Sequence, residues 1–219
     1  MNLAYTVEEV AGYTAHQLNA FFPDGRAVSA NVLKEYAQQA LDRTEFCFRR
    51  VALRSYCEDG QAKFDLLHSD QYCSYLYLLA NSIYRSEGDP GLASKVFYLN
   101  KALHAFNCMY DAMLPDIFLL LHVVGTVLGK ATYANYLVVR QNCTIGALGY
   151  AYPVLGEKLI LSAGASVIGG CRIGANVMIG PGCTVMKEDI PDNSLVTRTE
   201  SNTLKSNSDR PIKVHFNVE

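Results

Sequence analysis

One histidine near the middle of the chain stands where it could do acid–base chemistry. His122 lies in the apolar run LLLHVVG and is the only one of the five histidines within segment 121–185, which repeats every six residues. It directly follows an aliphatic position of that repeat, so its side chain is expected to point outward. An outward imidazole can take a proton from a hydroxyl near neutral pH. The apolar run by itself favours a different interpretation, a histidine packed among hydrophobic neighbours.

The six-residue period is the strongest pattern in the sequence. Counted in sixes, with one insertion of four residues, every position is apolar: Leu121, Val127, Tyr133, Val139, Ile145, Leu155, Leu161, Val167, Ile173, Ile179 and Val185. Two residues before these positions the side chain tends to be small, as in Ala131, Cys143, Ala165, Cys171 and Cys183. Neither an α-helix nor a β-hairpin has a period of six.

A coil with three short flat faces does have this period, with six residues per face. The aliphatic column would fill the interior, and the small column would sit at corners that are too tight for bulky side chains. The sequence therefore predicts an α + β chain. We expect a helical domain over residues 1–115, a parallel β-helix over 116–198, and a C-terminal loop and edge strand over 199–219.

The helical domain carries recognisable start signals. An amphipathic run follows each of four residues that favour helix starts, Thr6, Ser29, Ser69 and Asp89. These runs predict one helix from Thr6 to about Phe21, a second from Ser29 to about Arg54, a third after Ser69 and a fourth from Pro90 onward. In the fourth run, apolar residues alternate four and three positions apart, which is an a/d pattern that extends to residue 113. Its members are Leu92, Val96, Leu99, Leu103, Phe106, Tyr110 and Met113. That pattern fits packing within the helical layer or a seam between subunits. The tyrosines of residues 72–84 are expected in the core or at an interface.

The repeat also carries a family resemblance. The segments AGASVIGGCRIGANVMIGPGCTVMKEDIP, HVVGTVLG and QNCTIG resemble the hexapeptide-repeat acyltransferases, and more narrowly their serine acetyltransferase-like O-acetyltransferase branch, over roughly residues 89–197. The resemblance implies that the coil is left-handed, an exception to the usual crossover rule. It also implies a homotrimer, with a dimer of trimers through the helical domain as a further possibility. Acetyl-CoA would lie between neighbouring coils as co-substrate.

Within that resemblance, His122 matches the histidine that deprotonates the acceptor hydroxyl. The pair Asp116-Ile117 resembles the family's aspartate–isoleucine pair, which makes Asp116 the expected partner of the histidine. The spacing from Asp116 to His122 is shorter than in serine acetyltransferases, and Asp111 is the alternative. Either aspartate could instead form a cap or an ion pair at the junction between helices and coil.

The CoA moiety is expected along the outer corners of the later coils. Ala163, Gly164, Gly180 and Gly182 would allow its close approach to the backbone. Lys187 or Arg198 could meet its phosphates, although both could equally be solvated surface charges. No His/Cys pattern with metal-ligand spacing is present, so no metal is expected.

The acceptor is expected to be a sugar hydroxyl of a surface polysaccharide or its precursor, with L-serine as the alternative. The serine enzymes carry an aspartate where this chain has Leu121, and an arginine–histidine pair where it has Ala151-Tyr152. Tyr152, in the insertion of residues 147–154, would suit a sugar ring, whereas Arg140 could replace the lost arginine. A non-catalytic hexapeptide scaffold and a nucleotide-sugar N-acyltransferase are the alternatives from other classes.

Composition and charge exclude several classes of partner and location. The net charge is −2, and no run of Lys or Arg offers an electrostatic surface for nucleic acid. The start MNLAYTVEEV does not resemble a signal peptide, and the apolar run of residues 117–129 is too short for a membrane span. Seven cysteines without paired spacing predict free thiols, and we expect a cytoplasmic protein.

Overall fold

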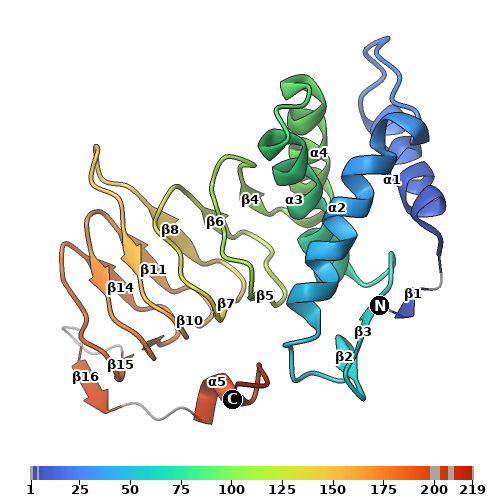
Figure 1. Cartoon of the computed structure of the whole chain (residues 1–219). Helices are drawn as coiled ribbons and strands as arrows, with labels where there is room; N and C mark the ends of the chain where they lie inside the picture. The colour runs from blue at the N-terminus through green and yellow to red at the C-terminus, as the bar shows by residue number, and fades with distance from the viewer. Residues whose placement is uncertain (1, 4, 198–202, 207–209, 219) are drawn as a thin grey trace.

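Four helices form the N-terminal layer of the computed structural model, which describes residues 2–3, 5–197, 203–206 and 210–218. They are α1 (Val7–Phe21), α2 (Ala30–Phe48), α3 (Ser69–Arg85) and α4 (Pro90–His104), and they stand together at one end of the molecule (Figure 1). The predicted capping box is present, with the Thr6 hydroxyl accepting from the Glu9 backbone N–H. Ser29 and Asp89 also cap their helices as expected.

Two helix ends differ from the sequence prediction. Helix α2 ends at Phe48 rather than near Arg54. Helix α4 ends at His104, because Ala105 adopts φ +50° and its backbone N–H bonds to the Lys101 carbonyl. The last part of the a/d pattern is therefore not helical, and its residue Met113 is exposed. The earlier residues Leu92, Val96 and Leu99 are buried within this chain.

The core of the helical layer is centred on α3. The side chains on the predicted face of this helix are all buried, namely Tyr72, Tyr75, Leu76, Leu79 and Ile83. A small sheet of β1 (Asn2–Leu3), β3 (Gln61–Phe64) and β2 (Cys57–Glu58) flanks the helices. Tyr72, Tyr75 and Tyr77 belong to a packed core, as expected from their helical spacing, whereas Tyr84 is exposed.

The C-terminal part is the predicted parallel β-helix with three faces. The first face stacks β5 (Phe118–Leu120), β7 (Leu137–Val139), β10 (Ile160–Leu161), β13 (Met178–Ile179) and β15 (Ser194–Thr197). The second stacks β4 (Asn107–Cys108), β6 (Val127–Leu128), β8 (Thr144–Gly146), β11 (Ser166–Ile168) and β14 (Thr184–Met186). The third pairs β9 (Val154–Leu155) with β12 (Arg172–Ile173). Strand pairing thus begins at Asn107, before the expected boundary at residue 116.

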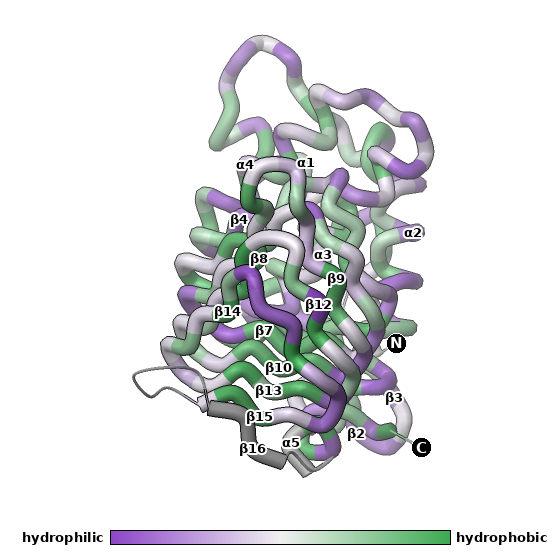
Figure 2. Tube along the Cα trace, turned by 90° about the vertical axis from the view of Figure 1, so that its left-hand side faces the viewer, coloured by the Kyte–Doolittle hydropathy of each residue, from purple (hydrophilic) through white to green (hydrophobic). Residues whose placement is uncertain are grey.

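The interior column matches the prediction from Val139 onward, and Figure 2 shows apolar residues recurring in the stacked strands β7, β10 and β13. The first coil differs by one residue at two positions. Leu120 pairs with Val139 and Leu128 pairs with Ile145, and both leucines are buried, whereas Val127 is 38% exposed. The corner between β5 and β6 is therefore longer than a regular repeat, and strict counting in sixes placed Leu121 and Val127 inside incorrectly.

Most of the small column is buried, and of the five small residues only Ala131 is partly exposed. Cys143, Ala165, Cys171 and Cys183 are all buried. All seven cysteines are free and buried, which agrees with the thiols expected from the sequence. One of them, Cys47 of α2, accepts the Phe118 backbone N–H at 3.4 Å and lies 3.0 Å from the Phe118 carbonyl oxygen. Burial raises the pKa of this thiol to about 12.

The end of the chain contains an edge strand, and a short helix follows it. Strand β16 (Thr203–Ser206) pairs antiparallel with β15, and the short helix α5 (Arg210–Lys213) follows. The chain then returns to the helical layer, where the Ala52 N–H bonds to the His215 carbonyl at 2.8 Å. The buried Phe216 ring packs edge-on against Tyr136 of the coil, with ring centroids 5.5 Å apart. This C-terminal segment, residues 212–218, therefore joins the helices to the coil.

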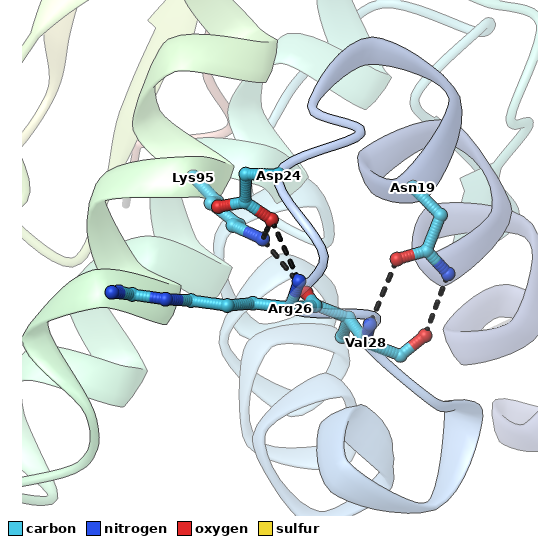
Figure 3. A network of polar contacts seen from close by, with 5 residues as sticks. All are labelled: Asn19, Asp24, Arg26, Val28 and Lys95. Atoms are coloured by element: carbon cyan, nitrogen blue, oxygen red, sulfur yellow. Dashed lines mark hydrogen bonds and ion pairs between the residues drawn. The ribbon is translucent and has the colours of Figure 1, made fainter.

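A polar network holds the loop between α1 and α2 against α4 (Figure 3). The Asn19 side chain forms two 2.8 Å hydrogen bonds with the backbone N–H and carbonyl of Val28. Lys95 of α4 donates to the Asp24 carboxylate at 2.7 Å and to the Arg26 carbonyl at 2.8 Å. A pocket of about 550 Å³ lies at this loop, on the helical layer and away from the coil.

Two glycines provide a matched test of coil and helix packing. A Cβ at Gly156 would lie 2.6 Å from the backbone C and O of Gly174 in the next coil, whereas a Cβ at Gly12 in α1 would meet nothing within 4 Å. We expect Gly156→Ala to lower the free energy of unfolding by about 1–3 kcal/mol. Gly12→Ala should raise it by about 0.5–1 kcal/mol. Chemical denaturation measures both, and equal effects would contradict the close contact of coils.

Candidate active site

His122 lies at the first corner of the coil, between β5 and β6. Its backbone adopts φ +54°, a left-handed conformation that few non-glycine residues take up. The side chain is 77% exposed. The predicted outward orientation is therefore correct, although the preceding interior residue is Leu120 rather than Leu121. The apolar run does not bury the imidazole, which is free to meet a ligand.

A buried carboxylate from the helical layer holds this histidine. Asp70, in the first turn of α3, accepts the His122 backbone N–H on Oδ1 at 3.0 Å. Its other oxygen, Oδ2, lies 3.5 Å from His122 Nδ1, and the Asp70 side chain is only 9% exposed. The N-terminal end of a helix favours a carboxylate at this place. The carboxylate thus holds the backbone of His122 by a hydrogen bond and lies within ion-pair distance of its ring.

This contact decides which ring nitrogen carries the proton. A carboxylate opposite Nδ1 favours the tautomer with the proton on Nδ1, which leaves the Nε2 lone pair available as a base. It also stabilises the imidazolium that forms when Nε2 takes a proton. The pair Asp70–His122 therefore has the chemistry of a general base with its orienting partner.

The two aspartates expected in this role lie elsewhere. Asp116 precedes β5 whereas His122 follows it, so the strand itself separates them by roughly 15–20 Å at about 3.3 Å per residue. Asp116 lines a different pocket together with Arg43 of α2. Asp111 forms an ion pair with Lys130 at 2.8 Å. Within the described residues neither aspartate is bonded to His122, and the expected pairing with Asp116 is replaced by Asp70.

Sequence reasoning did not single out Asp70. An acidic residue in the first turn of a helix is ordinary, because it complements the helix dipole. The one signal in the sequence is that no charged residue follows Asp70 over residues 71–83, all of which are buried in the structure. An acid at the start of such a helix needs a partner, but the sequence does not show that the partner lies 52 positions later.

A pocket of about 380 Å³ opens beside the pair, at the small end of the range for ligand sites. Its lining combines the N-terminus of α3, the last residue of α4 and the first corner of the coil: His68, Ser69, Asp70, His104, His122, Val123 and Val124. In the described part of the chain, no group of three or more His, Cys, Asp or Glu side chains is arranged to hold a metal ion.

Several residues expected at CoA lie along the same edge of the coil as His122. Backbone hydrogen bonds connect successive corners, from Asn142 N to Val124 O at 3.0 Å, and then, both at 2.9 Å, from Gly164 N to Gln141 O and from Gly182 N to Ala163 O. Gly164 and Gly182 have φ of +72° and +64°. Because neither has a side chain, the edge beyond His122 is open to a long ligand.

The other residues expected at CoA lie differently. A Cβ at Gly180 would be 2.6 Å from the Val196 carbonyl, so this glycine serves the contact between coils. Lys187 is exposed at the corner that follows β14, on the border where the second face ends. His122 precedes β6 and so lies on the opposite border, where the second face begins. Arg198 lies outside the described residues. Within one chain, therefore, Lys187 is not brought to His122.

The two residues expected at the acceptor are also separated. Tyr152 lies in the insertion of residues 147–154, which is closed by an antiparallel bridge between Leu148 and Ala151. It is 46% exposed and sits on the same border as Lys187. Arg140 is on the His122 edge, but its Nη2 lies 3.3 Å from His215 Nε2 in the C-terminal segment. Neither side chain lines the pocket beside His122.

Comparison with known proteins agrees with this architecture. Residues 152–187 match the family model described as bacterial transferase hexapeptide (six repeats). Over 112 residues the chain is 30% identical to a serine acetyltransferase of Synechococcus elongatus, covering 49% of this chain and 46% of that protein. The chain thus spans about half the length of this curated relative.

Solved structures match over most of the chain. The crystal structure of serine acetyltransferase from Brucella abortus strain S19 superposes with a TM-score of 0.72 at 18% identity, covering 94% of this chain and 86% of that one. A second structure of the Brucella protein, in complex with coenzyme A, gives a TM-score of 0.69 at 17% identity, with coverages of 94% and 84%. At these identities the match establishes the shared fold.

Fold and matches together define a class, the hexapeptide-repeat proteins with an N-terminal helical layer. Within it, the chain is similar to serine acetyltransferases, and the resemblance drawn from the sequence is confirmed. In the part of the chain that the structure describes, no helix has the length and apolarity needed to cross a lipid bilayer.

Proposed function

We propose that this protein is an acetyl-CoA-dependent O-acetyltransferase that uses His122 as general base. The observation that carries the proposal is the contact of the exposed His122 ring with the buried Asp70 carboxylate. Nε2 takes the proton of the acceptor hydroxyl, whose oxygen attacks the thioester carbonyl carbon. The C–O bond forms and the C–S bond breaks. The CoA thiolate leaves with the proton from Nε2, and no covalent enzyme intermediate is needed.

The open edge of the coil supports a place for acetyl-CoA. Gly164 and Gly182 expose backbone on the His122 edge, and no side chain from them blocks a pantetheine arm that extends along successive corners. The related Brucella structure in complex with coenzyme A supports the same co-substrate. We assign the edge of Ala163, Gly164 and Gly182 to CoA in this proposal. Lys187 is a candidate for its phosphates only from a neighbouring subunit.

For the acceptor we propose L-serine. The names of the relatives favour this alternative over the sugar that the sequence predicted. The argument for a sugar rested on Leu121 and on Tyr152, but Tyr152 lies on the other border of the second face. A sugar hydroxyl remains the second candidate, because the residues that line the pocket beside His122 include no Lys or Arg to pair with a carboxylate.

The test is a side-by-side assay of CoA release from acetyl-CoA. L-serine is compared with hexosamines, nucleotide sugars and polysaccharide fragments, and a reaction without acceptor measures hydrolysis. L-serine should have the highest kcat/KM. A higher kcat/KM for a sugar would show that the acceptor is a sugar rather than serine, and the proposed O-acetyltransferase activity would stand. CoA release that no acceptor stimulates would contradict the proposed function.

We further propose that the protein forms a trimer and shares its active sites between subunits. His122 lies on one border of the second face, and Tyr152 and Lys187 lie on the other. A threefold arrangement of coils would bring the His122 edge of one copy to the Tyr152 edge of the next.

We expect sedimentation equilibrium at micromolar concentration to give three times the chain mass of 24.1 kDa. Mixing His122→Asn subunits with Tyr152→Ala or Lys187→Ala subunits should give more activity than either parent alone, because some mixed sites carry both native edges. A single-chain mass would contradict the shared site.

A further inference from the structure

Two further histidines, His68 and His104, line the pocket beside His122 and Asp70, and the contacts of His104 define its hydrogen bonding. His104 is the last residue of α4, partly buried, with its ring edge-on to Tyr72 at 6.1 Å between centroids. It lines the same pocket of about 380 Å³. The proposed acetyl transfer does not require the His104 side chain. Its protonation state and its orientation can nevertheless be worked out from its neighbours.

The neighbours of His104 set its tautomer. The Asn100 side-chain amide donates through Nδ2 to the Cys73 carbonyl at 2.9 Å, so its Oδ1 is the atom opposite His104 Nδ1, at 2.8 Å. Because Oδ1 can only accept, Nδ1 must carry the proton. Burial lowers the pKa of His104, which favours the neutral ring. Nε2 of His104 therefore presents a lone pair and accepts hydrogen bonds.

The pocket thus combines two acceptor nitrogens with one negative charge. Nε2 of His122 takes the proton of the reacting hydroxyl, and Nε2 of His104 is left for a second donor of the ligand. Asp70 adds a carboxylate, and the residues that line the pocket include no Lys or Arg. The complementary ligand carries a hydroxyl next to a cationic donor, and an ammonium group meets both requirements.

We infer that His104 is a specificity-determining residue that accepts a hydrogen bond from the amino group beside the reacting hydroxyl, so the acceptor is a 1,2-amino alcohol. This inference rests on the proposed acetyl transfer and deepens it. It predicts that the amino group of L-serine contributes more to acceptor recognition than the carboxylate. Ethanolamine, which lacks the carboxylate, should therefore be a better ligand than 3-hydroxypropionate, which lacks the amine.

Two substitutions of His104 distinguish the proposed contact of Nε2 with the ligand from the hydrogen bond of Nδ1 with Asn100. In His104→Asn the side-chain amide can still donate to Asn100 Oδ1, but no atom reaches the place of Nε2. In His104→Gln the distal amide oxygen can replace Nε2 as acceptor. Calorimetry should show at least tenfold weaker binding of L-serine and of ethanolamine to His104→Asn, and His104→Gln should recover part of that loss. Binding of 3-hydroxypropionate and of acetyl-CoA should be unchanged in both variants.

Kinetics on the same set supplies a second measurement. His104→Asn should raise KM for L-serine at least tenfold and change kcat little, because His122 and Asp70 are intact. An equal loss for 3-hydroxypropionate would overturn the contact with the amine. A native protein that binds no amino alcohol would also overturn the inference. The native protein could bind amino alcohols, and lose that binding in His104→Asn, without releasing CoA. That result would support the binding site and contradict the proposed acetyl transfer.

Discussion

Asp70→Asn is expected to lower kcat by about 10³–10⁴-fold while the protein stays folded. The asparagine oxygen can still accept the His122 backbone N–H, which Asp70 now accepts at 3.0 Å. Its amide nitrogen would then face Nδ1 and donate to it, so the ring proton moves to Nε2. An imidazole with its proton on Nε2 cannot remove the proton of the acceptor. The carboxylate that stabilises the imidazolium is lost as well.

The measurement is CoA release at saturating acetyl-CoA and acceptor, with thermal unfolding as the control for folding. The loss of the negative charge at the N-terminus of α3 should cost at most about 1 kcal/mol of stability. Asp116→Asn is the matched control, because Asp116 lines a separate pocket. Normal kcat in Asp70→Asn, or a similar loss in Asp116→Asn, would show that Asp70 does not orient the base.

His122→Asn is expected to lower kcat by about 10²–10⁴-fold, the usual contribution of a general base. Asparagine suits this position better than alanine, because it tolerates the left-handed backbone that His122 adopts at φ +54°. It retains the backbone N–H that bonds to Asp70 and removes only the distal nitrogen. The exposed side chain contributes little packing, so the free energy of unfolding should barely change.

The double variant Asp70→Asn/His122→Asn tests whether the two residues act as one unit. We expect it to lose no more than His122→Asn alone, because an orienting carboxylate has no function without its base. Losses that multiply in the double variant would mean that Asp70 acts on catalysis independently of His122. Near-normal turnover of folded His122→Asn would exclude the histidine as base.

The sequence alone was sufficient for the fold, because each coil repeats a local rule. A strand of two or three residues, a tight corner and one buried aliphatic side chain recur every six residues, so Val139 to Val185 could be placed inside by counting. Helix starts were also readable, since Thr6, Ser29 and Asp89 cap their own helices through contacts within a few residues. Local rules failed at Leu121 and Val127, where the first corner is longer than the repeat.

The outward position of His122 was expected from the repeat, although the interior residue before it is Leu120 rather than Leu121, but the residues beside His122 were not expected. Asp70 and His104 lie on two helices that reach the first corner of the coil only because the helical layer is packed against it. Leu120 and Phe118 of the first strand bond to Tyr56 and Cys47 there. These contacts join positions more than 60 residues apart, and no local pattern encodes them. The repeat therefore determined the scaffold, whereas the packing of helices on the coil decided which carboxylate lies beside His122.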